Sequence, residues 1–174
     1  MTSEPIDLGR FIVYALEASQ LWVEKLSDGV SDEQFYRQPS VDTNSIAWLV
    51  FHLSRWRDKA SADVTGEPQV WISDGWAQRF AMNEERTGVG DTPGQVSQFR
   101  VPRDQVLGYA RAAHSACIER ISKLKPEHFD QHVEYWQGTK APAWRAFAGI
   151  IGDSHEHVGQ INYLRGLIGG LGWR

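Results

Sequence analysis

The residues best suited to chemistry lie in a polar segment near the carboxyl end, Gly152–Ile161, which contains one aspartate and two histidines. On a helix, which turns about 100° per residue, Asp153 and His157 share one face at about 40° from each other, and side chains at this spacing converge. His155 lies about 160° around the helix from His157, so the two histidines do not point the same way. Asp153 and His157 are therefore the pair that could hold one metal ion.

A third ligand has to come from another inward-facing position, and His52 is the best candidate. It lies in the most apolar stretch of the chain, Ile46–Leu53, one turn before Trp56. A histidine in such surroundings has two ring nitrogens that need polar partners. Two imidazoles and one carboxylate form the ligand set of zinc hydrolases and non-haem iron sites, which keep positions open for water or substrate.

The residues alone leave simpler explanations open. His52 could be a hydrogen-bonded histidine of the core, and Asp153 with His157 could be an ordinary hydrogen-bonded pair. Several other titratable residues are expected in contact with solvent: His128, His132, His155 and Glu156. His114, on the third long helix, is expected to be partly exposed. Cys117 lies on the apolar face of a helical stretch and is expected to be buried by packing rather than to act as a nucleophile.

Composition narrows the class of protein. The chain has 174 residues, a formal net charge of −4 and a single cysteine. Its length predicts one domain over residues 1–174, and its mild acidity argues against a nucleic-acid partner. One cysteine excludes an internal disulfide and a multi-thiolate metal site, so a metal would need nitrogen and oxygen ligands. Neither an export signal nor a membrane span is evident, so we expect a cytoplasmic protein without a membrane partner.

The candidate ligands fall on helices. Apolar residues recur at spacings of three and four in four long stretches, about Asp7–Leu26, Asn44–Val64, Arg103–Leu124 and Pro142–Ile168. Asn44 is predicted to cap the second stretch. A short helical turn is expected between Ser31 and Pro39, and a long crossover between Glu67 and Val101. With no clear strand alternation, the pattern predicts an all-α four-helix bundle with a long crossover between its second and third long helices.

Three segments resemble the DinB-like (DinB/YfiT) superfamily of four-helix-bundle proteins. They are Ser45–Leu53 on the second long helix, the polar stretch Asp32–Pro39 before it, and a motif on the last helix in which His157-Val158-Gly159-Gln160-Ile161 follows Asp153 and precedes Arg165. The similarity runs in order over nearly the whole chain.

The resemblance implies a metal site that three histidines usually form, with one on the second helix and a pair four residues apart on the fourth. His52 and His157 match two of these histidines, whereas Asp153 stands where the third is common. The carboxylate lowers the charge of the site by one and leaves zinc, nickel, iron and manganese open. The resemblance also implies reactions that depend on a low-molecular-weight thiol such as mycothiol or bacillithiol, because a metal favours the thiolate form.

Two functions follow as hypotheses. In the first, a divalent metal at the three candidate ligands serves a thiol-dependent transferase or isomerase, or a hydrolase, acting on a small molecule. Gln160 could then hydrogen-bond a bound molecule or one of the metal-binding side chains, and Arg55 or Arg165 could receive an anionic group. The tryptophans expected to wall the pocket are Trp56, Trp71 and Trp76. In the second, the chain is a non-catalytic, stress-associated bundle with a structural or vestigial metal site. A homodimer is expected in either case.

Overall fold

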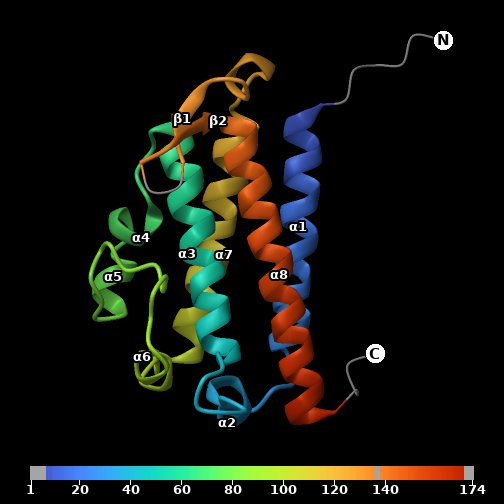
Figure 1. Ribbon diagram of the computed structural model, residues 1–174, viewed down its shortest axis with the longest axis vertical. Coiled ribbons are helices and arrows are strands. Elements are labelled where there is room, and N and C mark those ends of the chain that lie inside the picture. Colours follow the sequence, from blue (N-terminus) through green and yellow to red (C-terminus); the bar gives the residue numbers. More distant parts are fainter. Residues whose placement is uncertain (1–6, 136–137, 171–174) are drawn as a thin grey trace, which may run out of the picture.

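Four long helices form a bundle in the computed structural model, which describes residues 7–135 and 138–170 (Figure 1). This confirms the predicted fold class. The long helices are α1 (Leu8–Ser27), α3 (Ile46–Thr65), α7 (Arg103–Ser122) and α8 (Ala143–Gly169). The shorter elements are α2 (Asp32–Tyr36), α4 (Val70–Ser73), α5 (Trp76–Arg79), α6 (Pro93–Ser97), the 3-10 turn η1 (Pro126–His128) and the strands β1 (His132–Glu134) and β2 (Lys140–Pro142).

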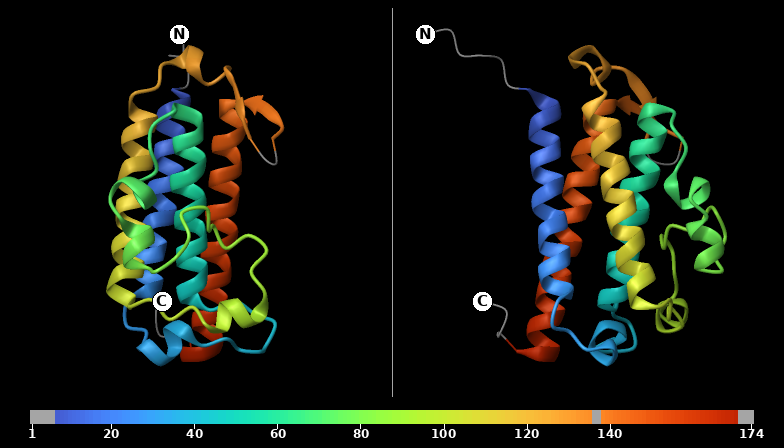
Figure 2. Two further views of the ribbon diagram at one scale, coloured as in Figure 1. Left: turned by 90° about the vertical axis from the view of Figure 1, so that its left-hand side faces the viewer. Right: turned by 180° about the vertical axis from the view of Figure 1, so that it is seen from behind.

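The connections set the directions of the helices. The crossover between α3 and α7 carries α4, α5 and α6 along the outside of the bundle and returns the chain to the end where α3 began (Figure 2). As a result α3 and α7 run parallel to each other, and α1 and α8 run the opposite way. Helix α3 packs against α7 and α8, while α1 packs against the other sides of the same two helices.

The ends of α3 are set by local chemistry. Ser45 caps its first turn, because the Ser45 hydroxyl accepts a hydrogen bond from the backbone N–H of Trp48. The prediction that Asn44 is the cap was wrong by one residue. Gly66 ends the helix in the left-handed conformation, at a φ of 72°, which glycine adopts without steric cost.

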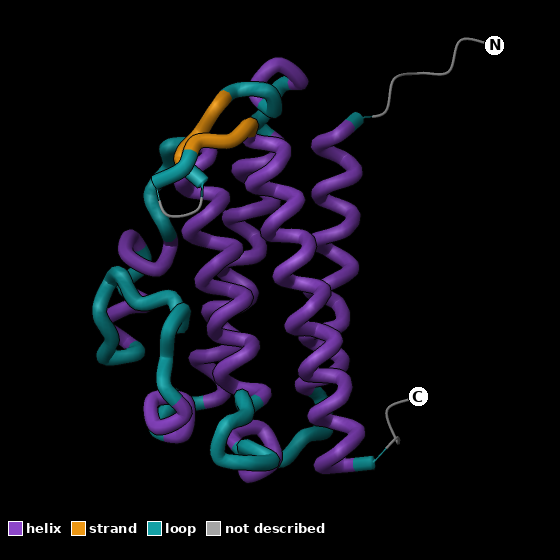
Figure 3. Tube along the Cα trace, in the orientation of Figure 1, coloured by secondary structure: helices purple, strands orange, loops and turns teal. Residues whose placement is uncertain are grey.

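A small β-hairpin joins α7 to α8 and was not predicted. Strands β1 and β2 pair antiparallel, with His132 opposite Pro142 and Glu134 opposite Lys140 (Figure 3). Each strand has three residues. Strands this short show too little alternation of polar and apolar residues to be recognised in the sequence.

The bundle core consists of two apolar clusters separated by a polar layer. One cluster includes Leu49 and Ile161 at the end near α2, and the other includes Leu16 and Phe147 at the end near the hairpin. Between them lies a group of buried or half-buried polar side chains, which we call the polar layer: Ser19, Gln20, Arg57, His114 and Ser154. None of the described helices meets the length and apolarity that crossing a membrane requires.

A second buried polar group, the Asp58 network, ties the crossover to the bundle. It consists of Asp58, Arg55, Tyr109 and Arg120, all fully or almost fully buried. Asp58 accepts hydrogen bonds from the first turn of α4, while Arg120 on α7 donates to the same carboxylate at 3.0 Å. These bonds hold the first turn of α4, and with it the start of the crossover, against α3 and α7.

Candidate metal centre

Three side chains from α3 and α8 meet at the surface between these helices. The Oδ1 atom of Asp153 lies 3.3 Å from Nε2 of His157 and 3.9 Å from Nε2 of His52. The two imidazole rings are nearly perpendicular, with centroids 4.9 Å apart. One ligand atom from each of the three residues falls within 4.8 Å of the others. The structure thus brings together the three residues that the sequence singled out.

The crossover holds the His52 ring from behind. The Nδ1 atom lies 2.8 Å from the carbonyl oxygen of Thr87, which can only accept, so Nδ1 carries the proton and Nε2 keeps its lone pair for the cluster. Trp48 stacks on the ring at 4.9 Å with the planes 7° apart, and its indole N–H donates to Asp91 of the crossover. Gly88 leaves room for this arrangement.

The close approach of Gly88 has a measurable basis. A Cβ atom on this residue would lie 3.0 Å from both Nδ1 of His52 and Cζ2 of Trp48, and its φ is +90°. Glycine is the residue that fits both the backbone conformation and the contact. Neither Thr87 nor Gly88 was identified from the sequence, because a backbone carbonyl leaves no side-chain signal; the only hint was the presence of turn residues in the crossover.

His157 is oriented from within α8. Its Nδ1 lies 2.9 Å from Oε1 of Gln160, one turn further along the helix, so Nδ1 donates and Nε2 again faces Asp153. A ring nitrogen held by an outer acceptor is the usual arrangement of a metal-binding histidine, because it fixes the tautomer and the ring plane. Gln160 therefore contacts a candidate metal-binding side chain, which is one of the two roles that the sequence allowed.

The two histidines have pKa values shifted in opposite directions. Burial lowers the pKa of His52, and the Thr87 bond and the charge of Asp153 only partly oppose this. Burial also acts to lower the pKa of His157, but the hydrogen bond and charge of Asp153, helped by Gln160, more than offset it and raise the pKa. Without a metal, His157 therefore takes up a proton more readily than His52 does.

The residues fit a divalent cation. The second carboxylate oxygen of Asp153, Oδ2, is buried and has no hydrogen-bond partner among the described residues. Buried carboxylate oxygens are normally satisfied, so an atom of this kind needs an explanation such as an ion. Ligand atoms around a tetrahedral zinc ion lie about 3.3 Å apart, which is the Asp153–His157 spacing, while His52 at 3.9 Å would move closer to bind. Two imidazole nitrogens and a carboxylate are suitable donors for zinc, iron, nickel or manganese.

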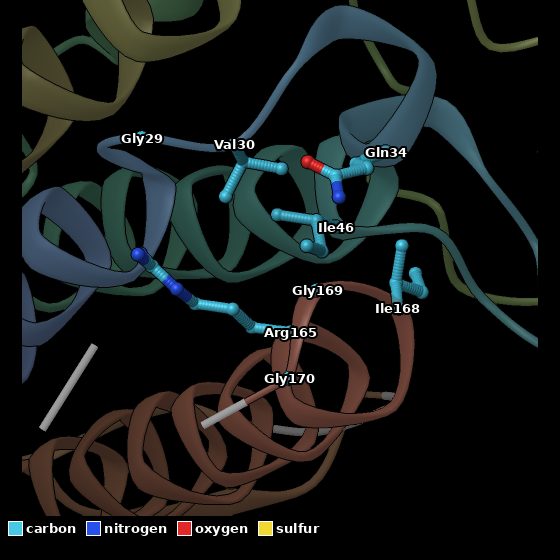
Figure 4. A pocket seen from close by; sticks show the side chains of 8 residues that line it. All are labelled: Gly29, Val30, Gln34, Ile46, Arg165, Ile168, Gly169 and Gly170. Carbon is cyan, nitrogen blue, oxygen red and sulfur yellow. The ribbon is translucent and has the colours of Figure 1, made fainter. Parts of the chain in front are cut away.

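Arg165 does not contribute to this site. Its Nη1 donates to the carbonyl oxygens of Lys25, Leu26 and Asp28 at the end of α1. It also borders a small cavity of about 80 Å³ near the end of α8, together with Gly169 (Figure 4). Three carbonyl groups occupy its Nη1 away from the candidate ligands, and an anionic group of a substrate at Arg165 stays a prediction.

Arg55 is unavailable to a substrate, because it is 1% exposed and its guanidinium belongs to the Asp58 network. Its Nε donates to the carbonyl oxygen of Arg86 at 2.8 Å, and Arg86 directly precedes Thr87. Arg55 and His52 on α3 thus hold neighbouring carbonyl groups of the same loop. The contribution of Arg55 to the site is to position the crossover.

The tryptophans of the crossover are part of the packing. Trp71 is 0% exposed and lies beneath the Arg55 guanidinium at 4.8 Å, so the prediction that it walls an open pocket was wrong. Trp76 packs on Tyr109 of α7, away from the α3–α8 contact. Trp56 does line an open groove beside the site, together with Thr87 and Tyr135 of the hairpin connection.

The remaining titratable candidates mostly lie where expected. His132, His155 and Glu156 are exposed, and His114 is half-buried. His128 is half-buried as well, since its Nδ1 accepts a hydrogen bond from the backbone of its own turn. Cys117 is buried, and burial raises the pKa of its thiol.

The protein is a four-helix bundle that carries a candidate metal site of two histidines and a carboxylate between α3 and α8. A family model described as the DinB superfamily matches residues 15–161. The chain belongs to this superfamily. Its fold is similar to that of a solved structure described as the conserved protein of locus from Enterococcus faecalis, with a TM-score of 0.85 and 18% identity over 96% of this chain and 100% of that one. No curated protein matches the sequence.

Proposed function

We propose that the chain is a divalent-metal-dependent enzyme whose centre consists of His52, Asp153 and His157. One observation carries the proposal: both histidines turn Nε2 toward Asp153 while their Nδ1 atoms are held by acceptors, and Asp153 keeps a buried oxygen without a partner in residues 7–135 and 138–170. This is the arrangement of a site prepared for a cation.

The reaction class follows from the donor set. A divalent ion held by three protein ligands supplies a Lewis acid with an open position for water, a small thiol or a substrate oxygen. The protein contributes the rest: Thr87 and Gln160 fix the tautomers, Trp48 fixes one ring plane, and Asp153 adds negative charge. The three candidate ligands have side chains between 10% and 24% exposed, which leaves an approach for a small molecule.

A non-catalytic bundle with a structural metal is the competing function. The two apolar clusters and the Asp58 network are complete without the three candidate ligands. A bundle stabilised in this way does not need an ion to fold, which supports a functional ion over a structural one.

The test begins with protein purified without a nickel column. Elemental analysis is expected to find one divalent ion per chain, and apoprotein is expected to take up zinc or manganese with the same stoichiometry. His52→Ala is expected to weaken uptake by at least about 100-fold, with little change in the melting temperature of the apoprotein. His155→Ala, an exposed histidine two residues from both Asp153 and His157, is the matched control and should bind as the original chain does.

Two results would contradict the proposal. One is the lack of stoichiometric metal together with no uptake by the apoprotein. The other is a metal whose removal lowers the melting temperature strongly while His52→Ala leaves turnover of thiol and hydrolase substrates unchanged, which would favour the structural role.

A further inference from the structure

The guanidinium of Arg57 lies at the centre of the bundle without an acidic partner. The side chain is 0% exposed. Its Nη1 donates to Oε1 of Gln20 and lies 3.4 Å from Nδ1 of His114, and its Nη2 donates to the hydroxyls of Ser19 and Ser154. Its Nε has no partner, and no ion pair joins Arg57 to an acid in the described part of the chain.

Such an arginine requires a counter-charge. Arginine is almost never fully buried unless it is paired, because removing a cation from water is costly. Every group that Arg57 contacts is neutral or can be neutral. Gln20, Ser19 and Ser154 carry no charge, while burial and then the charge of Arg57 itself lower the pKa of His114 to about 4.

Two groups nearby could carry a negative charge, Cys117 and Asp153. Burial raises the pKa of the Cys117 thiol, so this group stays neutral near pH 7. Asp153 directly precedes Ser154, to which Arg57 is bonded at 3.1 Å. The Oδ2 atom of Asp153 is buried and has no hydrogen bond to any residue that the structure describes. The unpaired cation on α3 is therefore bonded to the residue of α8 that directly follows Asp153, whose Oδ2 is buried.

We propose that Arg57 is the counter-charge of Asp153 and that it makes the metal centre select an anionic ligand. The inference rests on the proposed metal site. A divalent ion is only partly neutralised by Asp153, and Arg57 adds one more positive charge on the inner side of the cluster. A small anion in the open position reduces this excess, whereas a neutral ligand does not. Arg57 is a positioning residue, since it reaches the site through charge and through Ser154.

The charge of Arg57 can be cancelled without removing the side chain. Ser19 accepts from Nη2 of Arg57 at 2.9 Å, so Ser19→Asp places a carboxylate against the guanidinium. Ser19→Asn, of the same size but neutral, is the matched control. Arg57→Met removes the charge altogether, and Arg57→Lys retains it.

The experiment uses protein loaded with Co²⁺ and titrated with azide as the anion and imidazole as the neutral ligand, followed by visible absorption. Ser19→Asp and Arg57→Met are expected to bind azide on the order of tenfold more weakly, with imidazole binding unchanged. Both should bind Co²⁺ itself more tightly, because a nearby positive charge has been cancelled. Ser19→Asn and Arg57→Lys should behave as the original chain does. Acetate and 2-mercaptoethanol as further probes distinguish a carboxylate from a thiolate ligand.

The direction in which the Co²⁺ affinity changes separates this role from a structural one. A damaged site would bind Co²⁺ more weakly, whereas loss of the Arg57 charge should make binding tighter. Unchanged azide binding in folded Ser19→Asp, or weaker Co²⁺ binding in that variant, would overturn the inference while leaving the proposed function intact.

A second measurement needs no metal. In apoprotein, Asp153→Asn leaves Arg57 without its counter-charge, so it should lower the equilibrium constant for folding about fivefold more in the original chain than in Ser19→Asp. Equal effects in the two backgrounds would refute the coupling of Arg57 with Asp153. A failure of the protein to take up Co²⁺ would instead refute the proposed function, and this cycle would still decide whether the two charges are paired.

Discussion

Asp58 and Asp153 are two carboxylates of the bundle with opposite surroundings, the first fully buried and the second half-buried. Each oxygen of Asp58 has strong partners: Oδ1 accepts from Val70 N–H and Arg120, and Oδ2 accepts from Trp71 N–H at 2.9 Å. Asp153 has two histidines near Oδ1 and none of these partners at Oδ2. The carboxylate that holds the fold together, Asp58, thus has a full set of partners. The carboxylate of Asp153 keeps an oxygen that can bind a ligand.

The largest expected effect is on the free energy of unfolding, when the fully paired carboxylate of Asp58 is replaced. Asp58→Asn leaves Arg120 and Arg55 buried beside a neutral amide, and breaking such a pair costs about 3–5 kcal/mol. Urea unfolding should show this loss in the free energy of unfolding. Asp63→Asn removes an exposed carboxylate paired with Lys59 at 2.6 Å and should cost less than about 1 kcal/mol. Similar losses in the two variants would mean that the Asp58 network is not a stabilising clamp.

The next largest effect is on the metal affinity of the cluster around Asp153. Gln160→Ala removes the acceptor that holds His157, and loss of such an outer partner lowers metal affinity by about 10–100-fold. Calorimetric titration of apoprotein with zinc measures it. Gln160→Glu keeps an acceptor at the same place and should retain the affinity. If alanine binds zinc as glutamine does, the orientation of His157 does not depend on this bond.

A smaller effect tests the contact of the crossover with His52. Gly88 and Gly90 both have positive φ, but only a side chain at 88 would meet His52 and Trp48. Alanine at either position therefore costs about 1 kcal/mol in backbone strain. Only Gly88→Ala should also weaken zinc binding, by about tenfold. Equal zinc affinities for the two variants would contradict the role given to this loop.

The smallest effect is a pH dependence in the polar layer between the two regions. The pKa of His114 is lowered to about 4 by burial and by Arg57, against about 6.5 in the unfolded chain. The unfolded chain therefore binds this proton more readily. The stability that the neutral His114 side chain contributes to the folded protein is present above about pH 6.5 and is lost as the pH falls toward 4. Urea midpoints measured at several pH values should fall less steeply for His114→Asn than for the original chain. Parallel curves would exclude the contribution.

The helices and the candidate cluster could be predicted because both depend on local periodicity. The spacing of Asp153 and His157 fixes their common face on any helix, and the apolar run around His52 fixes its inward direction. These relations hold whatever the helices pack against.

The Asp58 network could not be predicted, because its residues have the composition of a solvated helix face. The run Ser54–Lys59 contains two arginines, an aspartate and a lysine, yet most of it is buried, by the crossover and by the neighbouring helices. Burial there depends on contacts across the chain, such as Arg120 with Asp58, which are 62 positions apart. The same reason applies to Thr87, whose carbonyl acts on His52 from 35 positions away.

The polar layer also fixes how the four helices align lengthwise. Arg57 bonds to groups on α1 and α8 and contacts His114 on α7, so sliding any one helix by a turn would strand a buried guanidinium. An apolar layer would tolerate such slippage, since leucine packs nearly as well against the next residue along. The buried arginine thus selects one register out of several that the apolar clusters alone would accept. It is this register that brings position 52 level with positions 153 and 157.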